Sequence, residues 1–197
     1  MNVTLTALGF IVFGYALGSL PFSIWVTRLF IGTDVRDGGS GHATATNAIR
    51  QAGWVAGVVV FVLDIAKGFL PTYLASQYGD VAWVVPLTAA FAVAGHNWPV
   101  WAGFRGGMGL AVTGGSLLAV YPVGFFAGVG LLIALVLIIK HGARATFIGA
   151  FLFAPLMWLL GAEMQVVWQT AAISLVLAIR FATDWNRKYR ELWLDRE

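Results

Sequence analysis

Long apolar runs dominate this chain and decide what it can fold into. Hydrophobic residues make up 59% of its 197 residues and charged residues 11%, against about 25% charged in a soluble domain. A helix that crosses a membrane needs roughly 20 apolar residues, or about 17 at the short end. The sequence therefore predicts an all-α polytopic membrane helix bundle, one domain over 1–197, with about seven transmembrane helices. The predicted spans are 3–27, 54–75, 82–97, 108–120, 122–139, 145–161 and 165–180, of which 108–120 is short enough to be a half-helix.

Lysines and arginines gather in alternate connections between these spans. Apart from Lys67, which lies within a span, they occur within 28–50, at 105, at 140–144 and from 180 onward, but not before 28 or at 76–81, 121 and 161–164. Because basic residues stay on the cytoplasmic side, this pattern places the N-terminus outside and the C-terminus in the cytoplasm. A five-span version, in which 82–120 crosses only partly, gives the same sidedness. The pI near 9.5 reflects topology, and no basic stripe indicates nucleic-acid binding.

A polar, glycine-rich stretch, GGSGHATATNAIR (38–50), lies between the first two predicted spans. Glycines let a backbone approach a ligand closely, and hydrogen bonds are offered by Ser40, Thr44, Thr46 and Asn47. Arg50 adds a permanently charged fork of donors that suits a phosphate. Polar backbone of this kind beside a bilayer predicts a site for an anionic ligand.

A second glycine-rich stretch, GFRGGMG (103–109), precedes the fourth span. Backbone N–H groups at the start of a helix attract anions through unpaired donors and the helix dipole. The stretch therefore predicts phosphate binding through Arg105, Gly106, Gly107 and Gly109. The alternative is that the glycines serve tight turns and that Arg105 is a topology charge.

Other polar residues have both a structural and a functional interpretation. Asp64 and Lys67 lie mid-span on one helical face, where charges usually pair within the bundle. They are either a structural ion pair, or Lys67 turns toward a cytoplasmic cavity. His96 and Thr146, near the ends of two spans, are either structural groups or part of the site.

Neither a metal nor a cofactor is expected. The chain has no cysteine, and His42, His96 and His141 lack the spacing of metal ligands. No Ser-His-Asp arrangement is visible. After the last span, Trp185, Tyr189 and Trp193 recur every four residues and predict a short helix on the membrane surface.

Six short segments share an informative order and spacing: GSLPF (18–22), DVRDGGSG (34–41), ATNAIR (45–50), DIAKG (64–68), GHNWP (95–99) and FRGGMG (104–109). Together they resemble the bacterial acyl-phosphate:glycerol-3-phosphate acyltransferases, the PlsY family. The resemblance implies a seven-helix enzyme of the bacterial inner (cell) membrane with cytoplasmic active-site loops. It also implies acyl transfer from acyl-phosphate to glycerol 3-phosphate, which gives lysophosphatidic acid and phosphate in phospholipid synthesis. The implied partners are both substrates and membrane lipid; a homodimer is left open.

The resemblance also assigns roles to residues. It places catalytic roles on Ser40 and Arg50. It places substrate-binding roles on Thr46, Asn47 and Thr146, where Thr146 stands at a family serine. The polar and glycine-rich segments add further substrate-binding candidates: Gly41, His42, Lys67, His96, Arg105, Gly106, Gly107 and Gly109.

Five positions depart from the family pattern. His42 stands at a family asparagine, Thr44 at a glycine, Met108 at a lysine, Phe181 at a histidine and Asp184 at an asparagine. Losing the lysine predicts weaker phosphate binding, and an ionised Asp184 beside a substrate phosphate would repel it. Three functions stay open: this acyl transfer with an altered site, transfer to a less anionic acceptor, and a catalytically weak protein that binds acyl-phosphate or lipid.

Overall fold

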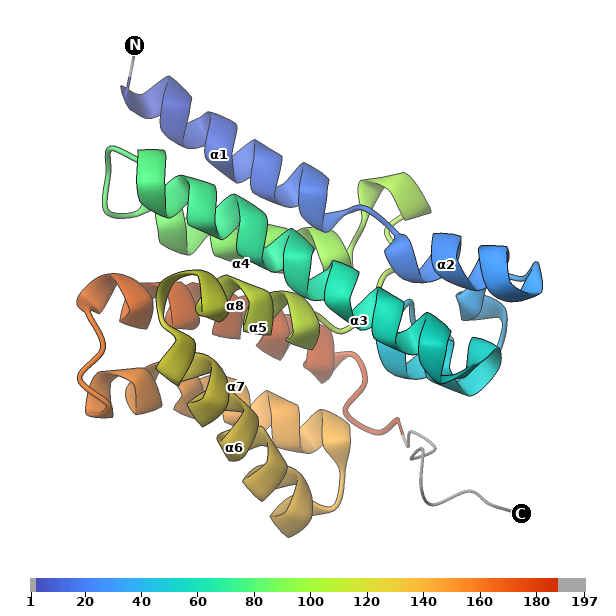
Figure 1. Cartoon of the computed structure of the whole chain (residues 1–197). Coiled ribbons are helices and arrows are strands. Elements are labelled where there is room, and N and C mark those ends of the chain that lie inside the picture. The colour runs from blue at the N-terminus through green and yellow to red at the C-terminus, as the bar shows by residue number, and fades with distance from the viewer. Residues whose placement is uncertain (1–2, 188–197) are drawn as a thin grey trace.

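The structure, a computed structural model that describes residues 3–187, consists of helices joined by short loops (Figure 1). The α-helices are α1 (Val3–Gly18), α2 (Phe22–Ile31), α3 (Ala45–Tyr78), α4 (Val84–Asn97), α5 (Leu110–Val120), α6 (Pro122–Ile139), α7 (Gly142–Leu159) and α8 (Met164–Ala182). Two 3-10 turns, η1 (Val35–Asp37) and η2 (Val100–Ala102), lie in the loops before α3 and α5. No strand occurs within 3–187, and the all-α prediction is confirmed.

Within the described part of the chain, five segments are long and apolar enough to cross a membrane. The segment Leu5–Ile31 comprises most of α1 with all of α2, and α3, α6, α7 and α8 complete the set. By contrast, α4 has 14 residues and α5 has 11, or roughly 21 and 16 Å at 1.5 Å per residue. Both are shorter than the roughly 30 Å of a bilayer core. The predicted short fourth span is confirmed as α5.

The first two predicted spans have different boundaries in the structure. The span 3–27 is divided, since α1 ends at Gly18 and α2 begins after Pro21, which cannot donate a backbone hydrogen bond to a continuous helix. The second helix begins at Ala45 rather than near 54, and it is interrupted at Gly53 by a left-handed backbone with φ 86°. Arg50, expected in a loop, therefore lies on the first part of α3.

Glycines bring the helices at the centre of the bundle into close contact. A Cβ added at Gly18 would collide with the backbone of Ala92, so α1 and α4 meet there almost backbone to backbone. Gly68 of α3 and Gly115 of α5 likewise each face backbone of the other helix. Lipid provides no hydrophobic drive between helices, so close approach at small residues stabilises their association.

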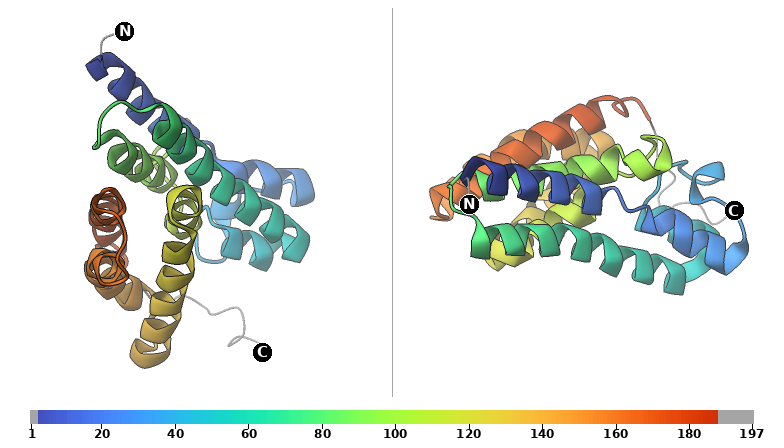
Figure 2. Two further views of the ribbon diagram at one scale, coloured as in Figure 1. Left: turned by 60° about the vertical axis from the view of Figure 1, so that its left-hand side comes forward. Right: turned by 90° about the horizontal axis from the view of Figure 1, so that it is seen from above.

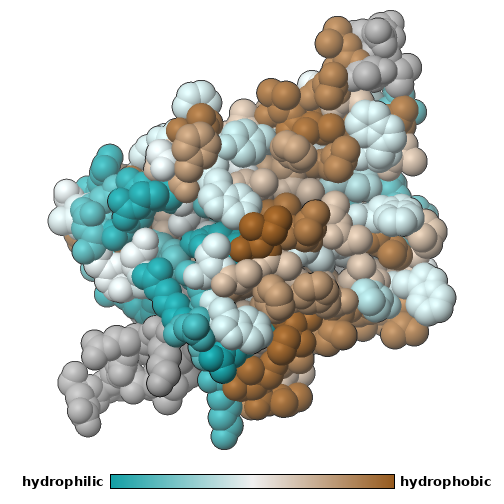
Figure 3. Space-filling view, turned by 180° about the vertical axis from the view of Figure 1, so that it is seen from behind, coloured by the Kyte–Doolittle hydropathy of each residue, from teal (hydrophilic) through white to brown (hydrophobic). Residues whose placement is uncertain are grey.

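Polar loops gather at one end of the bundle. The loops before α3 and before α5 meet where the backbone N–H of Ala43 donates to the Gly106 carbonyl at 3.2 Å. Seen from above, the two loops lie at the same end, away from the N-terminus (Figure 2, right). Hydrophilic side chains cluster on one side of the space-filling view, and hydrophobic ones cover most of the remainder (Figure 3). The candidate site lies at this polar end of the bundle.

The segment after α8 forms a turn through Thr183–Asn186 that folds back toward the same loops. The surface helix predicted there falls mostly on residues 188–197, which lie outside the described residues.

Candidate active site

A cavity of about 560 Å³ opens where the polar loops meet the bundle. Seven of the predicted site residues border it: Ser40, His42, Thr46, Arg50, His96, Gly109 and Thr146. The structure places the other six away from its wall: Gly41, Asn47, Lys67, Arg105, Gly106 and Gly107.

Three helices begin at this cavity. Its lining includes Ala45 at the start of α3, Leu110 at the start of α5 and Gly142 at the start of α7. The first N–H groups of each helix have no partner within the helix, and the helix dipole adds partial positive charge there. Three N-termini directed at one space make it favourable for a ligand with several negative charges.

The loop 38–44 takes its shape from the side chain of Asn47. The Asn47 Oδ1 atom accepts the backbone N–H of Ser40 at 3.0 Å. Its Nδ2 atom lies 2.7, 3.1 and 3.0 Å from the carbonyl oxygens of Val35, Gly38 and His42. Because Asn47 is fully buried and these groups occupy both ends of its amide, its contribution to the site is to position Ser40 and His42.

Thr44, which stands at a family glycine, has a structural role at the start of α3. Its hydroxyl oxygen accepts the backbone N–H of Asn47 at 3.2 Å, and its backbone is extended, as at a helix N-cap. A glycine at this position would lack that side-chain bond. Thr44 therefore fixes the start of α3 at the cavity wall.

Asp34 and Arg36 tie the first loop to the second. The Asp34 carboxylate accepts bonds from Arg28 and from both the backbone and guanidinium of Arg36 at 2.9–3.0 Å. Burial raises the pKa of Asp34, but its bonds to Arg36 and the charges of Arg36 and Arg28 outweigh this and hold that pKa below its usual value. Oriented in this way, Arg36 donates to the Ala102 carbonyl at 2.8 Å and the Arg105 carbonyl at 3.2 Å.

Arg50 is the available cation of the cavity. Its side chain is half-buried and borders the cavity from α3. Within the described residues 3–187, no hydrogen bond or ion pair engages its guanidinium. A bidentate donor at the cavity wall, without a partner among the described residues, suits a phosphate or carboxylate ligand.

The second glycine stretch contributes backbone rather than a charge. Arg105 is exposed and does not border the cavity. Gly106 and Gly107 are buried, and a Cβ at either would strike the backbone or ring of His96. Gly109 has φ 83°, which favours glycine, and it turns the chain into α5 at the cavity. The stretch that was predicted to bind phosphate therefore borders the cavity through Gly109 and the first residues of α5, and its binding of phosphate stays a prediction.

Asp64, Lys67 and His96 form a buried polar group behind the cavity. The Lys67 Nζ atom lies 2.9 Å from Asp64 Oδ1 and donates to the Leu20 carbonyl at 3.1 Å. His96 Nδ1 lies 3.6 Å from the same Asp64 oxygen. Asp64 and His96 border the cavity, whereas Lys67 does not. The structural interpretation of Lys67 matches this geometry, with Lys67 fixing Asp64 at the cavity wall.

Two of the family departures contact each other. His42 Nε2 lies 3.0 Å from Asp184 Oδ2, with both side chains less than 10% exposed. Arg180 and Arg187 lie 3.7 and 3.8 Å from the Asp184 carboxylate. The expected repulsion of a substrate phosphate by Asp184 is therefore offset within the protein, since its negative charge faces two arginines.

The other two substituted site positions are apolar and share a cluster. Met108 and Phe181 are 9% and 3% exposed and belong to one buried hydrophobic cluster with residues of α4, α5, α7 and α8. Both also border the cavity. Where the family pattern has a lysine and a histidine, this chain therefore has an apolar wall.

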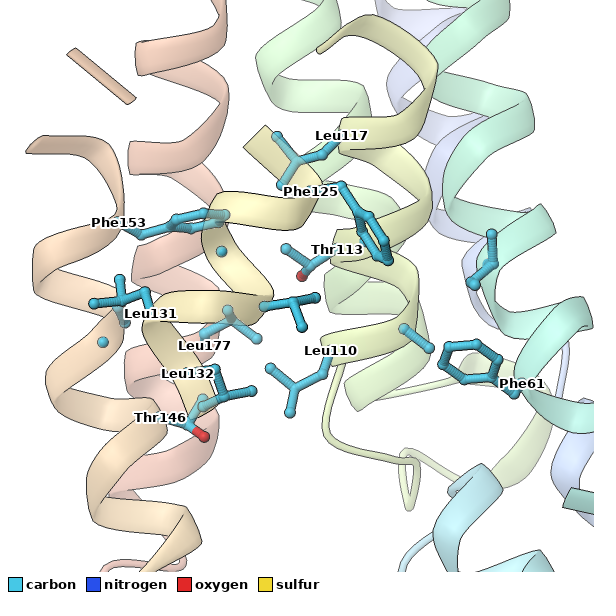
Figure 4. Close-up of a pocket in the computed structure, with 17 residues that line it drawn as sticks. Phe61, Leu110, Thr113, Leu117, Phe125, Leu131, Leu132, Thr146, Phe153 and Leu177 are labelled. Carbon is cyan, nitrogen blue, oxygen red and sulfur yellow. The ribbon is translucent and has the colours of Figure 1, made fainter. Parts of the chain in front are cut away.

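A second, apolar pocket of about 200 Å³ adjoins the polar cavity (Figure 4). Both are bordered by Phe61, Leu110, Ala111, Leu132 and Thr146. Figure 4 shows Thr146 at one end and Leu117, Phe125 and Phe153 at the other. The Thr146 hydroxyl donates to the Gly142 carbonyl at 3.0 Å, so Thr146 stands at the junction with its hydroxyl bonded to the helix.

Arg180 contacts two residues of the site, although it was not among the predicted site residues. Its Nε atom donates to the Gly107 carbonyl at 2.9 Å, and its Nη2 atom lies 2.9 Å from His42 Nδ1. In the sequence it stands at the end of the last span, where topology alone explains an arginine. Only its position in the fold distinguishes it from the other basic residues there.

Known proteins of one family are similar to this chain over most of its length. The sequence profile of a family described as glycerol-3-phosphate acyltransferase matches residues 8–191. A glycerol-3-phosphate acyltransferase of Parasynechococcus marenigrum (strain WH8102) is 36% identical over 94% of this chain and 87% of its own length. One from Listeria monocytogenes serotype 4a (strain HCC23) is 34% identical over 88% of each chain.

Solved structures are similar over the same length. The crystal structure of PlsY (YgiH), an integral membrane glycerol 3-phosphate acyltransferase, in its glycerol 3-phosphate form has a TM-score of 0.80 and 32% identity, covering 92% of this chain and 91% of that one. The lysophosphatidic acid form has a TM-score of 0.79, 29% identity and the same coverage.

Proposed function

We propose, because this chain belongs to the glycerol-3-phosphate acyltransferase family, that it transfers a fatty acyl group from acyl-phosphate to glycerol 3-phosphate. The products are lysophosphatidic acid and inorganic phosphate, and the reaction serves phospholipid synthesis. The chain is accordingly a multi-pass membrane enzyme.

The observation that carries this proposal is the junction of two unlike cavities. The polar cavity combines three helix N-termini with Arg50, whose guanidinium has no partner among residues 3–187, and this combination suits phosphate groups. The apolar pocket starts at Thr146 and suits an alkyl chain. A fatty acyl phosphate has a phosphate and an alkyl chain on either side of its reactive carbonyl carbon. Bound across the junction, it holds that carbon near Thr146 with its phosphate toward Arg50.

The chemistry requires positioning and charge stabilisation. The glycerol hydroxyl oxygen bonds to the acyl carbon, the bond from that carbon to the phosphate oxygen breaks, and the hydroxyl proton leaves with the departing phosphate. Acyl-phosphate is already activated, so no covalent acyl-enzyme is needed. Ser40, Thr46 and Arg50 would hold the phosphates, while backbone N–H groups at the start of α5 stabilise charge that develops on the acyl oxygen.

The same proposal sets the sidedness of the molecule. The enzyme would lie in the inner membrane of a bacterium, with its polar loops and the end of α8 facing the cytoplasm. The phosphate groups of both substrates are accessible on that side. The segregation of lysine and arginine supports this orientation. The clustering of the loops at one end of the bundle also supports it (Figure 2).

A donor comparison tests the proposed reaction. Purified protein in detergent is incubated with radiolabelled glycerol 3-phosphate and either palmitoyl phosphate or palmitoyl-CoA. We expect labelled lysophosphatidic acid from palmitoyl phosphate alone, and about ten- to a hundredfold less of it from the Arg50→Ala variant at limiting glycerol 3-phosphate. Product from palmitoyl-CoA alone, or from neither donor, would contradict the proposal.

A second acceptor is favoured by one observation, the apolar wall of Met108 and Phe181. A less anionic acceptor would make better contact with this wall than a second phosphate does. Unphosphorylated glycerol and 1-monoacylglycerol, offered with palmitoyl phosphate in the same assay, decide between the two. A higher kcat/KM for either one than for glycerol 3-phosphate would establish the alternative acceptor.

A further inference from the structure

His42 connects two segments that are far apart in sequence. Its Nδ1 atom lies 2.9 Å from Arg180 Nη2, 138 residues away, and its Nε2 atom lies 3.0 Å from Asp184 Oδ2. An arginine can only donate, so Nδ1 must accept from Arg180. The proton of the neutral ring is then on Nε2, from which it donates to the Asp184 carboxylate. Both ring nitrogens are therefore engaged in one chain of hydrogen bonds.

The same chain reaches both loops of the cavity. Arg180 Nε donates to the carbonyl of Gly107, in the second glycine stretch, at 2.9 Å. Arg187, which lies 3.8 Å from Asp184, donates to the carbonyl of Ser40 in the first loop at 2.5 Å. The end of α8 and the turn that follows it thus bind each loop through one arginine. Asp184, buried between these two arginines, connects them.

We propose that His42 and Asp184 form a positioning pair that holds Arg180 and Arg187 against the two loops and thereby sets the shape of the glycerol 3-phosphate site. The pair touches neither reacting atom, and it acts through the loop backbone. This inference rests on the proposed function. It adds that two departures from the family pattern act as one unit, because each is the partner of the other.

The charges around His42 agree with a structural role for a neutral ring. The charged groups that face it are Arg180 at the end of α8, and Asp184 and Arg187 beyond that helix. Burial, together with the charge of Arg180, lowers the pKa of His42 to about 4, against the opposing effect of Asp184. At neutral pH the ring is therefore an uncharged donor and acceptor whose nitrogens are both occupied.

Substitutions at position 42 separate positioning from proton transfer. In His42→Gln, one amide supplies an oxygen that accepts from Arg180 and an NH₂ that donates to Asp184, but it cannot carry a proton. His42→Ala supplies neither contact. We expect the KM for glycerol 3-phosphate to rise at least about tenfold in His42→Ala and less than about threefold in His42→Gln, since a lost contact to a charged group changes affinity tenfold or more. We expect kcat to change little in both.

A double-mutant cycle tests the pairing. Asp184→Ala should raise KM about as much as His42→Ala, and the double variant should be no worse than the worse single one, because each single change already removes the shared contact. The exposed Asp80, at the opposite end of the bundle, supplies a matched control, and Asp80→Ala should leave KM unchanged. If the alanine variants do not fold, Asp184→Asn keeps an acceptor for His42 and should raise KM about threefold.

A second readout does not depend on turnover. A nitroxide label on a cysteine placed at the exposed Ala182, in this cysteine-free chain, reports the mobility of the end of α8. We expect a more mobile spectrum in the Asp184 and His42→Ala variants, and a wild-type spectrum in His42→Gln. If the wild-type protein shows no acyl transfer, the proposed function fails while the spectra still decide on the pair.

Two results would overturn the pair itself. One is that the Asp184 variants and His42→Ala fold but show the same KM and the same label mobility as the wild type. The other is a loss of kcat in His42→Gln equal to that in His42→Ala, which would identify His42 as a proton carrier.

Discussion

Asn47 holds Ser40 in place, because its Oδ1 atom accepts the backbone N–H of Ser40 at 3.0 Å from within a fully buried side chain. The first prediction follows from this relationship. Asn47→Ala leaves that N–H and several loop carbonyls without their partner, and each such buried group costs about 1–3 kcal/mol. We expect a lower thermal midpoint in detergent, with unfolding easier by at least about 3 kcal/mol, and loss of acyl transfer. Gln77→Ala, on an exposed polar residue at the other end of the bundle, is the control and should melt like the wild type.

Arg50 gives the opposite pattern. Because no described residue bonds to its guanidinium, Arg50→Ala should leave the thermal midpoint unchanged while it lowers kcat/KM for glycerol 3-phosphate by about ten- to a hundredfold. Arg50→Lys should restore little of this, since an ammonium does not reproduce the bidentate fork. Near-normal turnover of Arg50→Ala at limiting glycerol 3-phosphate would mean that the phosphate binds elsewhere.

The apolar pocket predicts a dependence on acyl chain length. Ala150 is buried in its wall, so Ala150→Leu should fill part of the space. We expect the ratio of kcat/KM for palmitoyl phosphate to that for octanoyl phosphate to fall about tenfold, because the shorter chain needs less of the pocket. At roughly 1.4 kcal/mol for each factor of ten, this is within the 1–3 kcal/mol of typical overpacking. Gly130→Leu, on α6 where an added side chain meets open space, should leave the ratio unchanged.

The orientation in the membrane can be tested with single cysteines, since the chain has none. Asp37 is exposed in the first loop, and Asp80 is exposed in the connection between α3 and α4 at the opposite end. In right-side-out membranes, an impermeant maleimide should label Asp80→Cys and leave Asp37→Cys unlabelled until the membrane is permeabilised. The reverse pattern would invert the proposed topology.

The low pKa of His42 predicts a loss of stability in acid. The unfolded ring binds a proton near pH 6.5 but the folded ring only near pH 4, so between these values the unfolded state holds more protons and stability falls as the pH falls. The full window corresponds to roughly 3 kcal/mol at 1.36 kcal/mol per pKa unit. We expect His42→Gln to lose less of its thermal midpoint between pH 7 and pH 4.5 than the wild type. An identical loss in both proteins would show that His42 does not contribute.

What the sequence could predict depends on the range of the interaction. Apolar runs depend only on residues close together in the chain. They predicted the helical class and the short α5 correctly. Arg50 could be singled out because an arginine beside glycines and hydroxyls has few other uses near a membrane. The N-cap role of Thr44 was also readable, since it needs only three residues, yet it was read as a departure.

Long-range pairing explains what the sequence could not provide. The partners of His42 lie at the end of α8, and nothing local in either segment indicates the other. Asp184 alone suggested repulsion of a phosphate, and only the fold supplies the arginines and the ring that offset its charge. Asn47 was predicted to bind substrate, and its bonds to the loop could not be predicted as well, because the path of that loop could not be derived from the sequence.

The peripheral position of α6 bears on how a lipid-like donor is supplied. Gly124 is the one buried residue among Pro122–Ile139, and this helix nevertheless lines both the polar cavity and the apolar pocket. A single helix would then separate the pocket from the hydrocarbon of the bilayer, and we expect a lipid-like donor to reach the pocket past α6 without passing through water. Turnover would then follow the mole fraction of acyl-phosphate in the membrane, and diluting the vesicles at constant lipid composition would leave the rate per enzyme unchanged.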